Sequence, residues 1–167
     1  KQEDKINIVD PAGTGIIYDK FYRFEGYQIY QMKNATAGVT DLDDQSLARQ
    51  VAQCDIKNGV SRMVNFNFDE VLGFSVPIEK VKGEDKGIKH SFRITEDMFA
   101  SGDRKLVNNK TYYYIAVAYA YNNYKTFDPT DPQLLDGQKK PYLRSTKNAD
   151  GSTVKAFVVI PHHVEPE

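Results

Sequence analysis

The stretch that decides the fold is LVNNKTYYYIAVAYAYN, residues 106–122. Asn108 and Asn109 favour a turn, and the run of aromatic, β-branched and alanine residues that follows favours a strand covered on at least one face. Because successive side chains of a strand point to opposite faces, the run presents two apolar sets. The sets are Tyr112, Tyr114, Ala116, Ala118, Ala120 and Tyr113, Ile115, Val117, Tyr119, Tyr121. The pattern predicts a central strand of a β-sheet.

Shorter alternations of apolar and polar residues along the chain predict an all-β protein. Core strands are expected at residues 20–32, 87–95, 111–122 and 154–160. Two weaker strands are expected at residues 6–9 and 16–18, with a turn over residues 10–15 between them. A chain of 167 residues lies in the size range of one domain, so a single elaborated domain is expected.

Two segments, residues 34–86 and 123–153, are longer than simple connections and are expected to be insertions. In the first, residues 41–48 predict one capped helical turn, and residues 52–56 predict a strand. A hairpin is expected over residues 62–76, with a proline ending its second strand. Several aromatic residues predict that both insertions are folded: Phe66, Phe68, Phe74, Phe127 and Tyr142.

Two motifs carry a family resemblance. Leu106 precedes Tyr112 by six residues, and this spacing resembles the corner before strand F of fibronectin type III-like and immunoglobulin-like sandwiches. FEGYQIY, residues 24–30, is similar to strand C of the fibronectin type III family, in which a tyrosine (here Tyr27) follows glycine. The resemblance implies an antiparallel β-sandwich with Leu106, Tyr112 and Tyr27 as structural residues, the Tyr112 hydroxyl being bonded to nearby backbone. The tryptophan usual in strand B is missing, because the chain has no Trp.

The sequence also resembles modules of large secreted bacterial proteins, which implies an extracellular or cell-surface location. A fibronectin type III-like sandwich has two strands before strand C, yet only about twenty residues precede it here. We therefore expect one sheet to be short of strands. A flanking domain or another protein chain is expected to complete the open sheet edge.

Composition argues against two classes of partner. The chain has 22 Lys+Arg and 23 Asp+Glu, so it lacks the basic field that drives nucleic-acid binding. No stretch has the length and apolarity of a transmembrane helix, and the first residues lack the apolar core of a signal peptide, so no membrane insertion is expected. Cys54 is the one cysteine and is predicted to be a small core or edge residue.

Clustered acids raise the question of calcium, which binds carboxylate oxygens. Asp41, Asp43 and Asp44 are weak candidates, because the glycine and final glutamate of an EF-hand loop are absent. Capping of the helical turn is the favoured interpretation. A second group of possible calcium ligands is Asp128, Asp131 and Asp136. Asp-Pro steps are common at the start of turns, so a structural role in turns is the favoured interpretation.

Histidines offer little for catalysis or for a transition metal. His90 fits a half-buried position on a strand, and His162, His163 and Glu165 lie near the end of the sequence given. Adjacent strand residues point to opposite faces, which disfavours His162 and His163 as joint metal ligands. No catalytic residue, no cofactor and no resident metal is expected.

Two classes of function remain open. The first is a non-catalytic structural, adhesion or protein-interaction module within a larger extracellular protein. The second is a module that binds carbohydrate or another ligand on an aromatic platform. The residues expected to form that platform are Tyr121, Tyr124, Phe127 and Tyr142.

Overall fold

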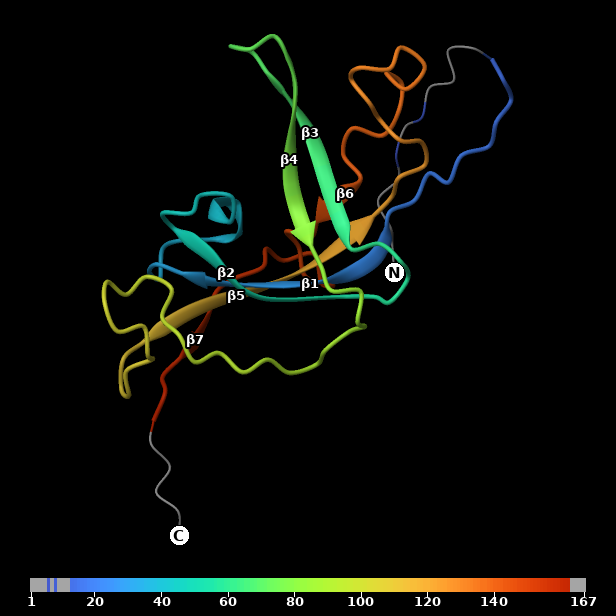
Figure 1. The fold of residues 1–167 in the computed structure, drawn as a ribbon. Helices are drawn as coiled ribbons and strands as arrows, with labels where there is room; N and C mark the ends of the chain where they lie inside the picture. Colours follow the sequence, from blue (N-terminus) through green and yellow to red (C-terminus); the bar gives the residue numbers. More distant parts are fainter. Residues whose placement is uncertain (1–5, 7, 9–12, 163–167) are drawn as a thin grey trace. The chain divides into compact units, whose positions relative to one another are not determined.

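A computed structural model describes residues 6, 8 and 13–162 of the chain (Figure 1). Strand accounts for 38% and helix for 2%, which confirms the all-β prediction. Within the described part, no helix is long and apolar enough to cross a membrane. The elements are β1 Arg23–Met32, the 3-10 helix η1 Val39–Asp41, β2 Ala48–Asp55, β3 Arg62–Asp69, β4 Phe74–Lys82, β5 Tyr112–Tyr121, β6 Tyr142–Arg144 and β7 Phe157–Val159.

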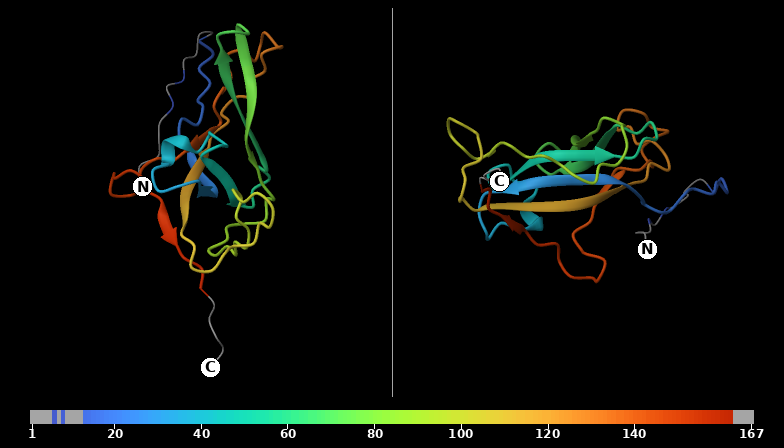
Figure 2. Two further views of the ribbon diagram at one scale, coloured as in Figure 1. Left: turned by 90° about the vertical axis from the view of Figure 1, so that its left-hand side faces the viewer. Right: turned by 90° about the horizontal axis from the view of Figure 1, so that it is seen from below.

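The strands form two antiparallel sheets. One has the order β2-β1-β5-β6, with β7 also paired to β5, and the other is the β3–β4 hairpin (Figures 1 and 2). The carboxyl-terminal residues of β5, Tyr119 to Tyr121, pair with β6, and its first three, Tyr112 to Tyr114, pair with β7. Strand β5 is therefore the central strand that its sequence predicts.

The chain divides into two compact units, and strands β1 and β5 contribute residues to both. The first unit comprises Lys1–Gly26, Asp55–Lys86 and Tyr119–Arg144. The second unit comprises Tyr27–Cys54, Gly87–Ala118 and Ser145–Glu167. Each is described separately below.

The core of the second unit is built on one face of β1 and β5. Ile115 and Val117 of β5 pack with Tyr30 and Met32 of β1, so the apolar set that contains Ile115 faces the core. The segment between β1 and β2 covers this face with Ala37, Val39 and Leu42. Burial of these side chains removes apolar surface from water, which is the main stabilising contribution to such a unit.

The core of the first unit joins the hairpin to β5 and β6. Met63 of β3 and Val81 of β4 pack with Tyr119 and Tyr142, whose ring centroids lie 5.5 Å apart. The Asn65 side-chain amide donates to the Tyr142 carbonyl and accepts from the Tyr142 N–H, both at 3.0 Å. These two bonds satisfy polar groups that would otherwise be buried without partners.

The hairpin extends beyond the predicted stop at Pro77. Strand β4 continues to Lys82, and Pro77 lies opposite Phe66. The Phe66 N–H donates away from β4, to the Lys139 carbonyl at 2.7 Å. Pro77 therefore occupies a position at which the β3–β4 ladder requires no N–H, so the prediction that it ends the strand is wrong.

The strand expected at residues 87–95 is not formed. Phe92 and Ile94 are half-buried and Ser91, Arg93 and Thr95 are exposed, so the alternation is present. Within the described residues, however, no strand pairs with this segment. A strand in a sheet needs a hydrogen-bonded neighbouring strand as well as side chains that alternate between two faces. The alternation of apolar and polar residues indicates only the direction of the side chains.

Three smaller expectations also change. Residues 16–18 form no strand, and residues 7 and 9–12 of the expected first strand and turn lie outside the described residues. The 3-10 helix η1 precedes the expected helical turn, and Ala48 begins β2, although the Asp44 carboxylate does accept the Ser46 N–H at 2.8 Å. The last strand is β7, which is shorter than residues 154–160.

Candidate interaction surfaces

One group of exposed apolar residues in the first unit lies at the end of the β3–β4 hairpin. We call it the hairpin tip. Its members, with the exposed fraction of each residue, are Phe68 at 66%, Val71 at 95%, Leu72 at 55% and Phe74 at 55%. Phe68 and Phe74 were expected to be covered, and the structure leaves both in solvent. Phe68 lies opposite Ser75 and Phe74 lies opposite Asp69, so the two rings point to opposite faces of the hairpin. Soluble monomers rarely expose this many large apolar side chains at the end of one hairpin without a function.

The hairpin tip has a defined conformation. One carboxylate oxygen of Asp69 accepts the N–H groups of Val71 and Leu72 at 2.9 and 3.0 Å. The Gly73 N–H donates to the Asp69 carbonyl at 2.8 Å, and Gly73 has a φ of 75°, which favours glycine. A turn held in this way presents its apolar side chains at a reduced entropic cost of binding.

The hairpin tip carries only negative charge. Asp69 and Glu70 lie within it, and no Lys or Arg occurs from Phe66 to Pro77. The sequence prediction missed this surface, because it treated the aromatics of the segment as buried. The available signal was the sequence FDEVLGF, in which the turn itself contains two large apolar residues.

A second apolar surface lies in the second unit, on β7. We call it the β7 edge, and define it by the exposed fractions of Phe157 at 49%, Val158 at 58%, Val159 at 37% and Ile160 at 51%. Among the described strands, β7 pairs only with β5. Figure 2 shows β7 beside the first part of β5.

The residues expected to form an aromatic platform do not form one. Phe127 and Tyr142 are buried, and Tyr121 and Tyr124 are half-buried. Phe127 packs edge-on against Phe66, with ring centroids 4.9 Å apart. These rings therefore serve mainly as packing within the first unit.

An open groove of about 700 Å³ in the first unit is a candidate ligand-binding site, and one of the expected platform residues, Tyr124, lines it. Its lining combines aromatic with polar and basic side chains. Those residues include Tyr22, Phe66, Tyr124, Gln138, Lys139 and Lys140. Such a mixture is typical of surfaces that bind small polar ligands.

The structural residues suggested by the family resemblance lie in the second unit. Tyr112 is buried, and its hydroxyl accepts the Val107 N–H at 2.9 Å, which is the local backbone bond that the spacing predicts. Leu106 is half-buried. Tyr27 is 38% exposed, whereas the neighbouring Gln28 is fully buried and donates to Gln50 and Gln53.

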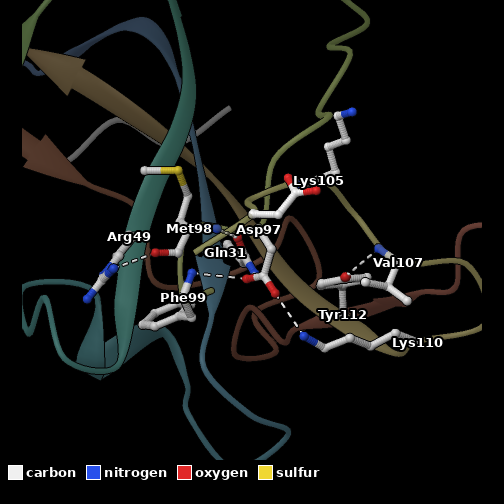
Figure 3. Close-up of polar contacts among 10 residues, drawn as sticks. Gln31, Arg49, Asp97, Met98, Phe99, Lys105, Val107, Lys110 and Tyr112 are labelled. Atoms are coloured by element: carbon white, nitrogen blue, oxygen red, sulfur yellow. Dashed lines mark hydrogen bonds and ion pairs between the residues drawn. The ribbon is translucent and has the colours of Figure 1, made fainter. Parts of the chain in front are cut away.

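A polar network lies beside Tyr112 (Figure 3). The buried Asp97 carboxylate accepts the Gln31 amide at 2.7 Å, the Lys110 ammonium at 2.8 Å and the Phe99 N–H at 3.0 Å. Burial acts to raise the pKa of Asp97, but these three donors outweigh burial and hold the pKa below its ordinary value. Lys110 also lies 5.1 Å from the centre of the Tyr112 ring.

The same network fixes the loop after Asp97. The Met98 N–H donates to the Gln31 side-chain carbonyl at 2.7 Å, and Arg49 donates to the Met98 carbonyl (Figure 3). The Arg49 guanidinium lies 4.6 Å from the centre of the Phe99 ring. The arrangement satisfies backbone groups of the loop and engages both oxygens of Asp97 with donors of the chain, so we assign it a structural role.

The first unit buries two carboxylates, Glu25 and Asp55, and the half-buried Asp85 lies beside them. The Asn58 amide donates to both oxygens of Glu25, at 3.0 and 2.9 Å, and Asp55 accepts the Asp85 N–H at 3.0 Å. Burial raises the pKa of Glu25 to about 6, the Asn58 bonds oppose this, and the charges of Asp55 and Asp85 add to it. Gly83 packs so closely on Asp55 that an added Cβ would lie 1.8 Å from its carboxylate.

The candidate metal ligands are engaged in local turns. Asp41 accepts the Gly38 N–H at 2.8 Å, and Asp128 and Asp131 accept N–H groups two residues ahead. Asp43 is exposed. Across the residues that the structure describes, no group of three or more His, Cys, Asp or Glu side chains is arranged to hold a metal ion.

The histidines are not gathered into a site. His90 is exposed, which corrects the half-buried position expected of it, and His162 is also exposed. His163 and Glu165 lie outside the described residues. Cys54 is buried, as expected of a small core or edge residue.

Comparison with known proteins adds no family to this description. The chain matches no family model, no curated protein and no solved structure.

Proposed function

We propose that this chain is a non-catalytic protein-interaction module of a larger extracellular or cell-surface protein, and that the hairpin tip is its contact with a partner. The observation that carries the proposal is the exposure of Phe68, Val71, Leu72 and Phe74 on one ordered turn. Apolar side chains that are exposed together and held rigidly resemble the anchors that dominate protein interfaces.

Several features support a sandwich of the fibronectin type III-like or immunoglobulin-like type. In such sandwiches strands C, F and G share a sheet, and β1 and β7 both neighbour β5 in this way. The Tyr112 hydroxyl bond fits the corner of strand F. The alternation at residues 87–95, which is not part of either described sheet, fits a strand E that a flanking domain would complete.

The chemistry of the hairpin tip indicates the kind of partner. Asp69 and Glu70 flank the apolar side chains, so a complementary surface offers an apolar pocket with a basic rim. A lipid bilayer is a poorer match, because insertion would carry two carboxylates toward the hydrocarbon and anionic headgroups would repel them. We therefore favour a protein partner.

The test compares retention of cell-surface proteins from the source organism on three forms of the chain. These are the wild type, a Val71→Ser/Leu72→Ser variant and a matched Val107→Ser control, since Val107 is 57% exposed outside the hairpin tip. We expect one protein to be retained by wild type and control but not by the tip variant. Binding of that protein, once purified, should weaken at least about tenfold on loss of the two anchors.

Two results would contradict the proposal. Equal retention by wild type and tip variant would show that the apolar turn is not the contact. Co-sedimentation with vesicles of phosphatidylcholine and phosphatidylglycerol, lost in the tip variant, would assign the turn to a membrane surface instead.

The open groove supports a second candidate function, the binding of a carbohydrate or another small polar ligand. Tyr124 lines the groove and is half-buried, so part of its ring is available for stacking. A glycan array probed with wild type and Tyr124→Ala separates the two candidates. Glycan binding that needs Tyr124 but not Val71 would favour the groove.

A further inference from the structure

The β7 edge differs from the hairpin tip because it has free backbone as well as apolar side chains. Strand β7 runs antiparallel to β5, with Val159 opposite Tyr112, Val158 opposite Tyr113 and Phe157 opposite Tyr114. No other strand within the described residues pairs with it. In any antiparallel pair alternate residues direct their N–H and C=O groups away from the neighbour, so this edge presents groups for a further strand.

The side chains of β7 make that edge unusual. Phe157, Val158, Val159 and Ile160 are all exposed, and successive residues of a strand point to opposite faces. Both faces of β7 are therefore apolar. Natural edge strands are protected by short length, by charged residues or by irregularities. Strand β7 is short, with three residues, but it carries no charge, and the nearest charged residue in the sequence is Lys155, before the strand begins.

We propose that β7 pairs with β7 of a second copy of this chain, antiparallel about a twofold axis at Val158. A strand that continues this edge needs apolar residues on both faces and an unpaired edge of its own. Strand β7 itself meets both conditions. A twofold axis also limits the assembly to a dimer, because the β7 edge of each copy is occupied by the other copy.

The register of this pairing places compatible residues opposite one another. Val158 lies opposite its own copy, and Phe157 lies opposite Val159 at two equivalent positions. Aromatic and β-branched residues form favourable cross-strand pairs. Lys155 lies opposite Pro161, so no like charges meet along the ladder. This interface is separate from the hairpin tip and does not depend on the proposed function.

The first test is the mass of the chain in solution from about 1 µM to about 1 mM, a range that spans weak and moderate complexes. We expect the mass to rise from 19.0 kDa toward twice that value. Val158→Lys places two ammonium groups at the axis and should remain monomeric throughout. Val107→Lys and Val71→Lys, at exposed valines outside β7, should still dimerise.

Three results would overturn the inference. They are a wild type that stays monomeric at the highest concentration, a Val158→Lys variant that still dimerises, and a dimer abolished by Val71→Lys. Circular dichroism and urea unfolding check that each variant is folded.

A cross-linking test addresses the register. In a Cys54→Ala background, which removes the native thiol, Val158→Cys should oxidise to a covalent dimer faster than Ile160→Cys. Residue 160 lies opposite residue 156 in this register, so two cysteines at position 160 would not be adjacent. Faster cross-linking of Ile160→Cys would contradict the twofold axis at Val158.

Discussion

Glu25 in the first unit and Asp97 in the second are equally buried carboxylates, each 3% exposed, but their pKa values shift in opposite directions. Burial disfavours the charged form of both. Asp97 meets an ammonium, a side-chain amide and a backbone N–H, which together outweigh burial. Glu25 meets one amide, from Asn58, while Asp55 and Asp85 add negative charge.

The difference shows that burial alone does not determine the state of a carboxylate. The partners decide it. In the second unit the Asp97 charge holds the Gln31 side chain of β1 and the Phe99 N–H of the loop after Asp97, so losing it removes structure. In the first unit the charge on Glu25 opposes folding at neutral pH, so losing it should be tolerated.

The largest effect is expected from breaking the Asp97 network. Asp97→Ala leaves the buried Gln31 amide without its acceptor and removes the cap on the Phe99 N–H, so it should lower the free energy of unfolding by about 2 to 4 kcal/mol. Urea unfolding at neutral pH measures this. Asp103→Ala is the matched control, because Asp103 accepts only the Lys105 N–H in an exposed turn. Equal losses in the two variants would show that the network contributes nothing beyond a local turn.

The pH dependence of Glu25 sharpens the comparison. Since its folded pKa of about 6 exceeds the ordinary 4.5, the folded chain binds the proton more tightly than the unfolded chain. The stability contributed by this group should therefore rise as pH falls from above 6 to below 4.5. Relative to wild type, Glu25→Gln should be more stable at pH 7.5 by at most about 2 kcal/mol, and this advantage should vanish near pH 4.

Urea unfolding of both proteins across this range provides the measurement. Glu70→Gln, which removes an exposed carboxylate of the hairpin tip, controls for the loss of one negative charge. If the curves of wild type and Glu25→Gln stay parallel from pH 4 to pH 7.5, Glu25 does not carry the linkage.

The smallest expected effect on stability concerns the hydroxyl groups of two tyrosines on β5. Tyr112 and Tyr114 are both buried, but the Tyr112 hydroxyl accepts the Val107 N–H, whereas the Tyr114 hydroxyl has no hydrogen-bond partner among the described residues. Tyr112→Phe should cost about 1 kcal/mol, and Tyr114→Phe should cost nothing or stabilise the chain. Thermal unfolding of the two variants measures whether each substitution lowers or raises the stability. A loss at Tyr114 as large as that at Tyr112 would contradict the assignment.

The sequence predicted strands β1 and β5, because their apolar patterns can be recognised locally. It wrongly predicted a strand at residues 87–95, because strand formation also requires backbone pairing with a distant segment. Strand β5 and strand β1 follow from long alternating or continuous apolar runs. Residues 87–95 have the same alternation, but no strand among the described residues pairs with them, and pairing is a non-local property. Pro77 was misjudged for a related reason, since its effect depends on which side of β4 carries the ladder.

The candidate surfaces were harder to predict than the strands. Tyr112 was placed through the family resemblance of its spacing from Leu106, and its hydroxyl bond to the Val107 N–H is local in sequence. Phe127 and Phe74 are both aromatic residues of the expected insertions, yet Phe127 is buried and Phe74 is 55% exposed. Phe127 is covered by Phe66, a residue far away in the sequence. Exposure is set by such distant contacts, which composition and alternation do not report.

The position of Cys54 turns the one thiol of the chain into a kinetic probe. Its side chain is buried in β2, with the sulfur 3.7 Å from the Lys89 carbonyl in the segment at residues 87–95. A thiol reagent reaches this sulfur only after β2 or that segment moves aside, so the labelling rate counts local openings and not global unfolding. When labelling is slow compared with closing, the rate divided by that of a free thiol gives the equilibrium constant for opening. Addition of a strand that pairs with the segment should therefore slow the chemistry at a residue that the strand never touches.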